Sequence, residues 1–332
     1  MNLAHVEQIA KAVLYEGYML YPYRPSSVKN RQRWNFGVLH PEAYSDEHGG
    51  EEPCSMRTEC LIFGNLDTTL EVKSRFLHLH MRSTSKAVEN SARPQPDGWQ
   101  EALERDVSLP AFRLERLISE PVRHRFVFPA ETRTDTEPEG GEESLVVRRR
   151  SQVSGDVEVS AKRVHENHLK ITIVVSNRTP LENPEASRDE ALMQSLVSTH
   201  IILGVEGGEF VSLLEPPEEL KELAAQCQNV GAWPVIVGEP GQRDTMLASP
   251  IILYDYPQIA PESAGDLFDG TEIDEILSLR IMTLTDEEKS EIRQSDERAS
   301  QILERTETMP AEQFMKLHGV LRSLRPLKEA TQ

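Results

Sequence analysis

Three cysteines and the lack of a long apolar run set the first limits on this chain of 332 residues. Cys54 and Cys60 are farther apart than the cysteines of a zinc knuckle, and Cys227 is distant, so neither a zinc site nor a disulfide framework is expected. No stretch of about eighteen apolar residues exists, and the N-terminus lacks the basic head and apolar block of a secretory signal. We therefore expect a cytoplasmic protein with no membrane span.

Motifs of the common enzymes are also missing. The glycine pairs that begin at Gly49, Gly140 and Gly207 lack the Gly-x-Gly-x-x-Gly or lysine-terminated pattern of a phosphate-binding loop, so they predict turns. No Gly-x-Ser-x-Gly elbow or His-Glu-x-x-His helix is present, which argues against the common hydrolases. The sequence thus predicts neither a catalytic residue nor a cofactor.

Positive charge is scarce as well. The chain has 36 Lys and Arg against 55 Asp and Glu, a formal net charge of −19. Long-range repulsion from phosphate groups makes nucleic acid an unfavourable partner, whereas a basic protein surface would be attracted.

One stretch, residues 15–36, reverses this composition and is here called the basic aromatic segment. It holds six of the nineteen aromatic residues and four bases against one acid, Glu16. Aromatic and arginine side chains contribute much of the binding energy at protein interfaces, which predicts a docking site. Two alternatives stay open: the tyrosines fill a groove within the fold, or the segment stacks on single-stranded nucleic acid. The residues concerned are Tyr15, Tyr18, Tyr21, Tyr23, Arg24, Lys29, Arg31, Arg33, Trp34 and Phe36.

A second stretch, residues 254–276, has the complementary character and is called the acidic segment. Its seven carboxylates alternate with apolar and aromatic residues, so part of it must pack on something, either the body of the protein or a partner. Our hypothesis is that the two segments meet and form one recognition surface. The candidate residues of the acidic segment are Tyr254, Asp255, Tyr256, Glu262, Asp266, Asp269, Glu272, Asp274 and Glu275.

Apolar spacing outlines the secondary structure. Val6, Ile9, Ala10, Val13 and Leu14 form the single apolar face of a helix. Alternating and apolar runs predict strands over 36–40, 59–63, 70–82, 112–118, 122–128, 144–149, 157–164, 169–176, 201–205, 210–214, 233–238 and 251–254. Helices are expected over 188–197 and from 218 to 227, the latter between strands.

The fold class expected from these elements is α+β. A mostly antiparallel sheet core with one strand-helix-strand crossover unit would occupy residues 1–254, with mobile loops near 46–53, 84–98 and 132–143. Residues 255–332 would form an acidic, mainly helical C-terminal arm, in which Thr285 and Glu288 have the spacing of a capping box.

Two histidines offer a metal site as an alternative. His78 and His80 are two residues apart on an expected strand, so their imidazoles point to the same side and could share one ion. His124, His165 or His168 could complete the set, although no acid or cysteine stands beside them at a diagnostic spacing. Two histidines on the wet face of a sheet explain the same pattern without a metal.

The two segments also carry a resemblance. Tyr15-Glu-Gly-Tyr-Met-Leu-Tyr-Pro-Tyr-Arg-Pro-Ser-Ser-Val-Lys-Asn and Ser249-Pro-Ile-Ile-Leu-Tyr-Asp-Tyr-Pro-Gln-Ile-Ala-Pro-Glu-Ser, continuing into Thr271-Glu-Ile-Asp-Glu, resemble the two characteristic blocks of an uncharacterised bacterial family. Its members are encoded beside uptake nickel-iron hydrogenases and their maturation factors. The resemblance implies an accessory or assembly role for such an enzyme, with a hydrogenase subunit or maturation factor as the protein partner.

Taken together, we expect a non-catalytic assembly protein that acts by protein binding. The alternatives are a metal-dependent enzyme that uses His78 and His80, and a module that binds an anionic small molecule through the tyrosines and arginines of the basic aromatic segment.

The pairing of the two segments can be tested by charge reversal. We expect Arg24→Glu and Arg33→Glu to couple with reversal of an acid such as Asp266, because two reversed charges attract again. A double-mutant cycle on thermal stability measures the coupling. Independent, additive effects of the reversed bases and acids would contradict the hypothesis.

Overall fold

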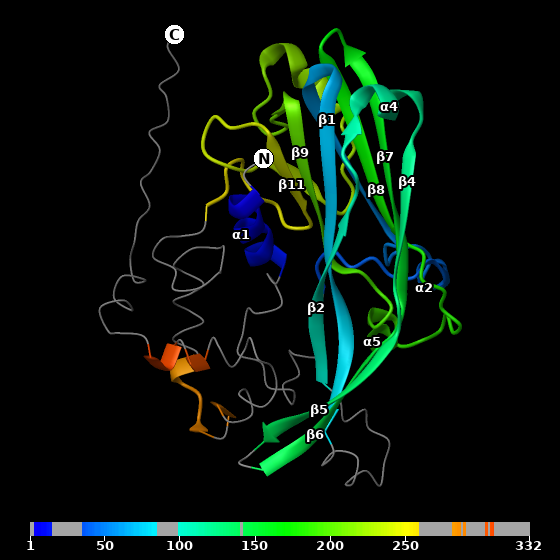
Figure 1. Ribbon diagram of the computed structural model, residues 1–332, viewed down its shortest axis with the longest axis vertical. Coiled ribbons are helices and arrows are strands. Elements are labelled where there is room, and N and C mark those ends of the chain that lie inside the picture. Colours follow the sequence, from blue (N-terminus) through cyan, green and yellow to red (C-terminus); the bar gives the residue numbers. More distant parts are fainter. Residues whose placement is uncertain are drawn as a thin grey trace. The chain divides into compact units, whose positions relative to one another are not determined.

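The computed structural model describes residues 3–14, 35–84, 99–139, 142–258, 281–286, 288–289, 303–304 and 306–308. The chain divides into two compact units, one of Met1–Tyr18 and Val28–Pro257 and a smaller one of Met19–Ser27 and Gln258–Gln332. The larger unit contains all the helices and strands that are labelled in Figure 1.

The larger unit is mostly sheet. Its helices are α1 (Leu3–Leu14), α2 (Glu42–Glu47), α4 (Leu114–Ser119), α5 (Arg188–Leu192) and α6 (Lys221–Ala225), the last preceded by the 3-10 turn η2 (Glu218–Leu220). Its strands are β1 (Ser55–Thr84), β2 (Trp99–Ser108), β3 (Phe112–Arg113), β4 (Val122–Phe128), β5 (Glu131–Glu139), β6 (Glu142–Arg150), β7 (Val153–His165), β8 (His168–Asn177), β9 (Val197–Val211), β10 (Trp233–Ile236) and β11 (Thr245–Ser249).

The helix predicted at the N-terminus is confirmed. All five apolar residues of its stripe, from Val6 to Leu14, are buried, and α1 packs against β9 and β11. Lys73 Nζ of β1 adds an ion pair at 3.1 Å to Glu7 Oε1. Burial of a whole aliphatic side chain contributes about 1.5–3 kcal/mol, so the stripe holds α1 on the sheet.

Strand β1 is the spine of the sheet and pairs with five other strands. Its first part pairs with β8, its middle with β9, and its last part with β2 on one side and β6 on the other. The strands expected over 59–63 and 70–82 are therefore one strand, interrupted by a bulge between Gly64 and Thr69. A Cβ on Gly64 would lie 2.6 Å from Thr68 Oγ1, so glycine is needed there.

The expected antiparallel sheet is confirmed. Every strand pairing in the described part of the chain is antiparallel. The expected crossover unit runs from β9 through α6 to β10. These two strands point the same way, because each is antiparallel to β11, which lies between them.

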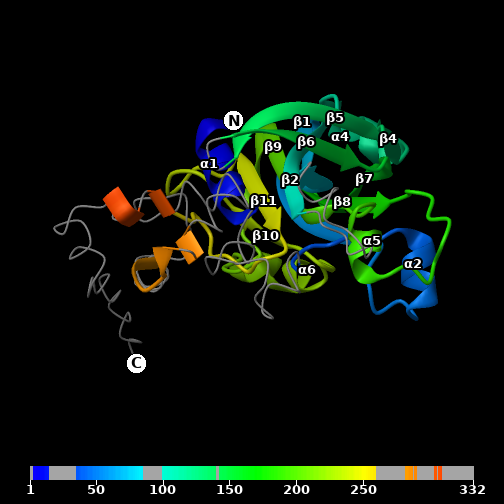
Figure 2. The ribbon, with the colours of Figure 1, turned by 90° about the horizontal axis from the view of Figure 1, so that it is seen from below.

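A two-stranded ribbon folds the sheet back on itself. Strands β4 and β5 follow each other directly and pair with β7 and β6, respectively. At one end of the ribbon β7 pairs with β8, and at the other end β6 pairs with β1. Figure 2 shows this ribbon arching between the two places. Ser151 and Gln152 lie between β6 and β7.

The apolar core lies inside this curve. Phe76 of β1 packs against Phe126 and Phe128 of β4, each with ring centroids 5.8 Å apart. Helix α4 packs against β7 and β1 and covers the core, with its Leu114 and Leu117 buried. The inner face thus begins as a hydrophobic surface, and it becomes charged only toward the end of β1.

Two expected strands are wrong. The run over 112–118 forms a strand only as far as Arg113, and α4 begins at Leu114. Leu114 and Leu117 are three residues apart, and this helical spacing, not the apolar content, sets which face is buried. Residues 251–254 form no strand; the last strand among the described residues is β11, which ends at Ser249.

The expected loops also differ. Residues 132–139 and 142–143 are not a loop, since 131–139 and 142–150 pair as the strands β5 and β6. Near 46–53, Asp46 and Glu47 complete α2 and residues 48–50 form a turn. The short strand expected over 36–40 is a single bridge between Leu39 and Leu196. Residues 85–98 lie outside the described residues.

In the smaller unit, the predicted capping box is confirmed. The Thr285 N–H donates to Glu288 Oε2 at 2.7 Å, and the Glu288 N–H donates to Thr285 Oγ1 at 3.3 Å. An ion pair at 3.1 Å joins Lys289 and Glu307. Most of the expected helical arm lies outside the described residues. Across the described ranges of both units, no helix combines the length and hydrophobicity needed to span a membrane.

A buried carboxylate, Glu59 of β1, fastens the loop after α6 to the sheet. It accepts hydrogen bonds from Lys170 Nζ at 2.9 Å, Thr172 Oγ1 at 3.2 Å and the Gln228 N–H at 2.9 Å. Burial raises the pKa of Glu59, but these hydrogen bonds outweigh it and hold the pKa below its ordinary value. The ionised carboxylate therefore stabilises the fold.

Replacement of Glu59 tests this fastening. We expect Glu59→Ala to lower the free energy of unfolding by about 3 kcal/mol at pH 7, because Lys170 is left without its partner. The folded pKa is depressed, so the contribution is complete above about pH 4.3, the ordinary pKa of an unfolded glutamate, and is lost as the pH falls through the folded pKa. Urea unfolding measures it; Glu158→Ala, at the surface pair with Arg123, should cost about 1 kcal/mol or less.

Candidate functional site

The predicted recognition surface is described only in part. Tyr254, Asp255 and Tyr256 belong to the described residues. The candidates of the basic aromatic segment from Tyr15 to Trp34, and those of the acidic segment from Glu262 to Glu275, lie outside them. The meeting of the two segments stays a prediction.

Asp255 anchors the segment that follows β11. Its Oδ1 accepts a hydrogen bond from the Ile236 N–H at 2.7 Å, and its Oδ2 accepts one from Ser212 Oγ at 2.5 Å. The Tyr256 N–H donates to the Ile236 carbonyl at 2.7 Å. Both oxygens of Asp255 are thus engaged within the fold, by β10 and by the residue after β9.

The anchored backbone turns one aromatic residue outward. Tyr256 has a φ of 55°, a left-handed conformation that costs a non-glycine residue free energy, and it packs against the core. Two residues that precede it are exposed: Tyr254 by 86% and Ile252 by 71%. Large exposed apolar side chains on a fixed backbone are a feature of binding surfaces, because little conformational entropy is lost on binding.

The two histidines of the metal alternative lie on the same face, as expected, but have separate partners. His78 is buried and its Nε2 lies 2.9 Å from the Ser151 carbonyl oxygen. His80 Nε2 lies 2.7 Å from Glu101 Oε2. Burial, and next the charge of Arg105, lower the pKa of His78 to about 4. Within the described ranges, no group of three His, Cys, Asp or Glu residues could hold a metal ion.

The same face carries a charged cluster that the sequence analysis missed. At the end of β1 the sheet has the strand order β2, β1, β6, β5. Arg82 lies opposite Arg148, which lies opposite Arg133, so three arginines form a row across three adjacent strands. We call Arg82, Arg133 and Arg148 the arginine row.

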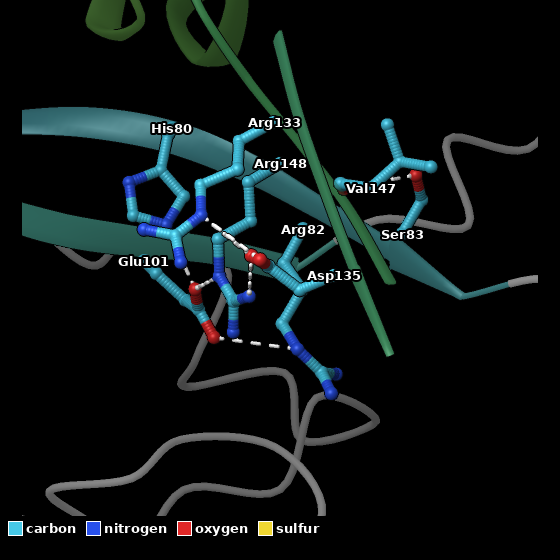
Figure 3. Close-up of polar contacts among 8 residues, drawn as sticks. All are labelled: His80, Arg82, Ser83, Glu101, Arg133, Asp135, Val147 and Arg148. Atoms are coloured by element: carbon cyan, nitrogen blue, oxygen red, sulfur yellow. Dashed lines mark hydrogen bonds and ion pairs between the residues drawn. The ribbon is translucent and has the colours of Figure 1, made fainter. Parts of the chain in front are cut away.

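Two carboxylates hold the arginine row together. Figure 3 shows the Arg148 guanidinium between Glu101 and Asp135. Arg148 Nε lies 2.9 Å from Glu101 Oε2 and its Nη1 lies 3.5 Å from Asp135 Oδ2. Arg133 pairs with Asp135 at 2.9 Å, and Arg82 lies 3.5 Å from Glu101.

Glu101 is the centre of this cluster. Burial raises its pKa, but hydrogen bonds from His80 and Arg148 outweigh that effect, so the pKa lies below its ordinary value. The carboxylate is therefore ionised at neutral pH. Without it, like charges on neighbouring strands would repel at short range.

One signal in the sequence could have found the cluster. Arg148, Arg149 and Arg150 are three consecutive arginines in a strongly acidic chain. The strand prediction over 144–149 treats them only as strand residues. Their partners could not be found from the sequence, because the acids come from β2 and β5, which pair with different strands.

A serine, a histidine and a glutamate also come together, but not as a nucleophile. Ser195 Oγ lies 3.1 Å from His40 Nδ1, and His40 Nε2 lies 3.2 Å from Glu52 Oε2. The Ser195 hydroxyl donates to the Ala191 carbonyl at 2.7 Å, and Ser195 and His40 are both fully buried. No substrate can reach this hydroxyl, so the arrangement is structural. Burial lowers the pKa of His40 to about 4, which keeps it neutral.

The comparisons with known proteins add no identification. Neither the comparison with models of protein families nor that with curated proteins finds a match to the chain.

The cohesion of the arginine row can be measured through Glu101. We expect Glu101→Gln to destabilise the protein by about 2 kcal/mol, because the negative charge that strengthens the hydrogen bonds from His80 and Arg148 is lost. Part of the loss should return in high salt, which screens the repulsion among the arginines. Urea unfolding at low and high salt measures both effects. Glu104→Gln, an exposed residue on the same strand, is the control; an equal effect there would refute the role given to Glu101.

Proposed function

We propose that this protein is a non-catalytic accessory or assembly protein that acts by binding another protein. The surface proposed for binding is centred on Ile252 and Tyr254 and includes the basic aromatic and acidic segments. The cytoplasm is its proposed location, and no cofactor is required for this role.

The observation that carries the proposal is the anchor at Asp255. Both carboxylate oxygens of Asp255 are hydrogen-bonded, which holds the backbone and the left-handed conformation of Tyr256 in place. Tyr254 and Ile252 are exposed on this held segment. A fold that only needed to be soluble would gain nothing from holding two apolar side chains outward. Tyrosine is also among the residues that contribute most to protein interfaces.

The charge of the chain supports a particular kind of partner. From Asp255 to Glu312 there are sixteen acids against five bases, so a partner with a basic rim around an apolar patch would be attracted. The resemblance of the blocks at 15–30 and 249–263 supports a nickel-iron hydrogenase subunit or maturation factor as that partner.

Affinity purification tests this role. In cells that express a nickel-iron hydrogenase, the tagged protein should recover a hydrogenase subunit or maturation factor, identified by mass spectrometry. Tyr254→Ala and Ile252→Ala should each reduce the recovered amount about tenfold, the effect of losing one strong interface contact.

The control is Val127→Ala, which removes an exposed apolar side chain from β4. It should leave recovery unchanged, and all three variants should keep the melting temperature of the wild type. Recovery of neither a hydrogenase subunit nor a maturation factor by the wild-type protein would refute the proposed function. Equal recovery by all variants would refute the surface.

A further inference from the structure

Arg105 of β2 has a buried hydrogen-bonding edge without an acceptor. Its Nε and Nη2 are both buried and reach no hydrogen-bond partner among the described residues. An arginine cannot escape this cost by losing its proton, because its pKa is too high. A buried charged donor without an acceptor costs free energy, so an unpaired one calls for an explanation.

A second arginine in the same strand pair shows which partner the Nε and Nη2 groups of an arginine bind. On the opposite face, Arg75 of β1 uses its Nε and Nη2 to bind both oxygens of Asp106, at 2.6 and 2.9 Å. Nε and Nη2 form one fork that matches the two oxygens of a carboxylate or the oxygens of a phosphate. In Arg105 the equivalent fork is buried and has no such partner within the described residues.

The surroundings of Arg105 hold the fork in place. The guanidinium lies over the Phe128 ring, 4.7 Å from its centroid, which fixes its plane. Burial, and next the charge of Arg150, lower the pKa of Arg105. Glu131 acts on Arg105 electrostatically, but its carboxylate is paired with Arg150 instead.

His78 adds a further polar atom to this place. Phe76 of β1 lies opposite Arg105, and His78 is the next residue of β1 on the same face as Phe76. Its Nδ1 is buried and has no hydrogen-bond partner among the described residues. Because Nε2 donates to the Ser151 carbonyl, Nδ1 of the neutral ring is an acceptor, so it can bind a protonated oxygen of a ligand, such as a phosphate hydroxyl, and not a bare oxyanion. The charges of Arg105 and Arg150 both act on His78, and that of Arg150 acts on Arg105, so the three groups lie near one another.

We propose that the Arg105 fork binds an oxyanion, a carboxylate or phosphate group of a ligand, inside the curved end of the sheet beside Arg150 and His78. The site is separate from the surface around Tyr254 and does not depend on the proposed function. Both nitrogens of the fork are shielded, so the ligand enters by displacing a neighbouring side chain. Glu131, whose side chain is 48% exposed, is the group that moves.

Thermal unfolding of the full-length protein tests the site with inorganic phosphate and with acetate, each against chloride at equal ionic strength. At a saturating concentration we expect one of these probes to raise the melting temperature by about 5 °C. A rise with phosphate alone identifies a phosphate site, and a rise with acetate alone identifies a carboxylate site. The absence of any rise beyond that in chloride, with both probes, would overturn the proposal.

Variants separate binding at the fork from a general effect of salt. Arg105→Met should abolish the rise and, without anion, should melt no lower than the wild type, because an unpaired buried charge is removed. Arg105→Lys keeps the charge but not the fork, so it should need at least about tenfold more anion. Glu131→Gln should need less anion than the wild type, because a competing carboxylate is gone.

Arg123→Met is the matched control. Arg123 also presents its Nε and Nη2 to one carboxylate, Glu158, but at the surface. Its loss should leave the response to anions intact. A full response in Arg105→Met, or in Arg105→Lys if the methionine variant does not fold, would overturn the proposal.

Discussion

The need to hydrogen-bond both edges of one long strand is the constraint on which this fold depends. A strand of thirty residues presents donors and acceptors along its whole length, and unpaired backbone groups in a core are costly. β1 meets this need with five partners, which change from β8 and β9 to β2 and β6 along its length. The ribbon β4–β7 must therefore bend back to reach the far end of β1. That return encloses the core and brings the arginines of β6 beside the acids of β2.

Charge is distributed unevenly over this framework. Although the chain carries a net charge of −19, the inner face at the end of β1 collects Arg82, Arg133 and Arg148, which pair with Glu101 and Asp135. Deeper inside, the guanidinium of Arg105 lies over the Phe128 ring. Salt bridges thus hold the outer arginines, whereas the fork of the inner one has no hydrogen-bond partner among the described residues. The surface around Tyr254 depends on a different device, an anchored and strained backbone.

Local patterns predicted the fold where one face decides the structure. The stripe from Val6 to Leu14 and the Thr285 capping box needed only neighbours within a few residues, and both are confirmed. The sequence pattern gave a wrong prediction where a strand far away in the chain decides the local structure. Residues 132–139 are acidic and contain Pro138, which favours a loop, but all of them pair with β6, and Asp135 forms a diagonal ion pair with Arg148. Backbone pairing and a diagonal pair of opposite charges stabilise a strand that the local sequence does not predict. At Leu114 the helical spacing was hidden in a run too short to show its period.

The sequence by itself determined the class of the fold, the positions of most strands and the helix α1, because hydrophobic period and capping are properties of adjacent residues. It also pointed to the segment around Tyr254, through its mixture of aromatic and acidic groups. Only the tertiary structure decided that Asp255 bonds to Ser212 and Ile236, that Glu101 joins His80 to Arg148, and that the Nε and Nη2 of Arg105, unlike those of Arg75, bind no acid among the described residues. These pairings depend on register between strands far apart in the chain, where a shift of one residue moves every side chain to the other face.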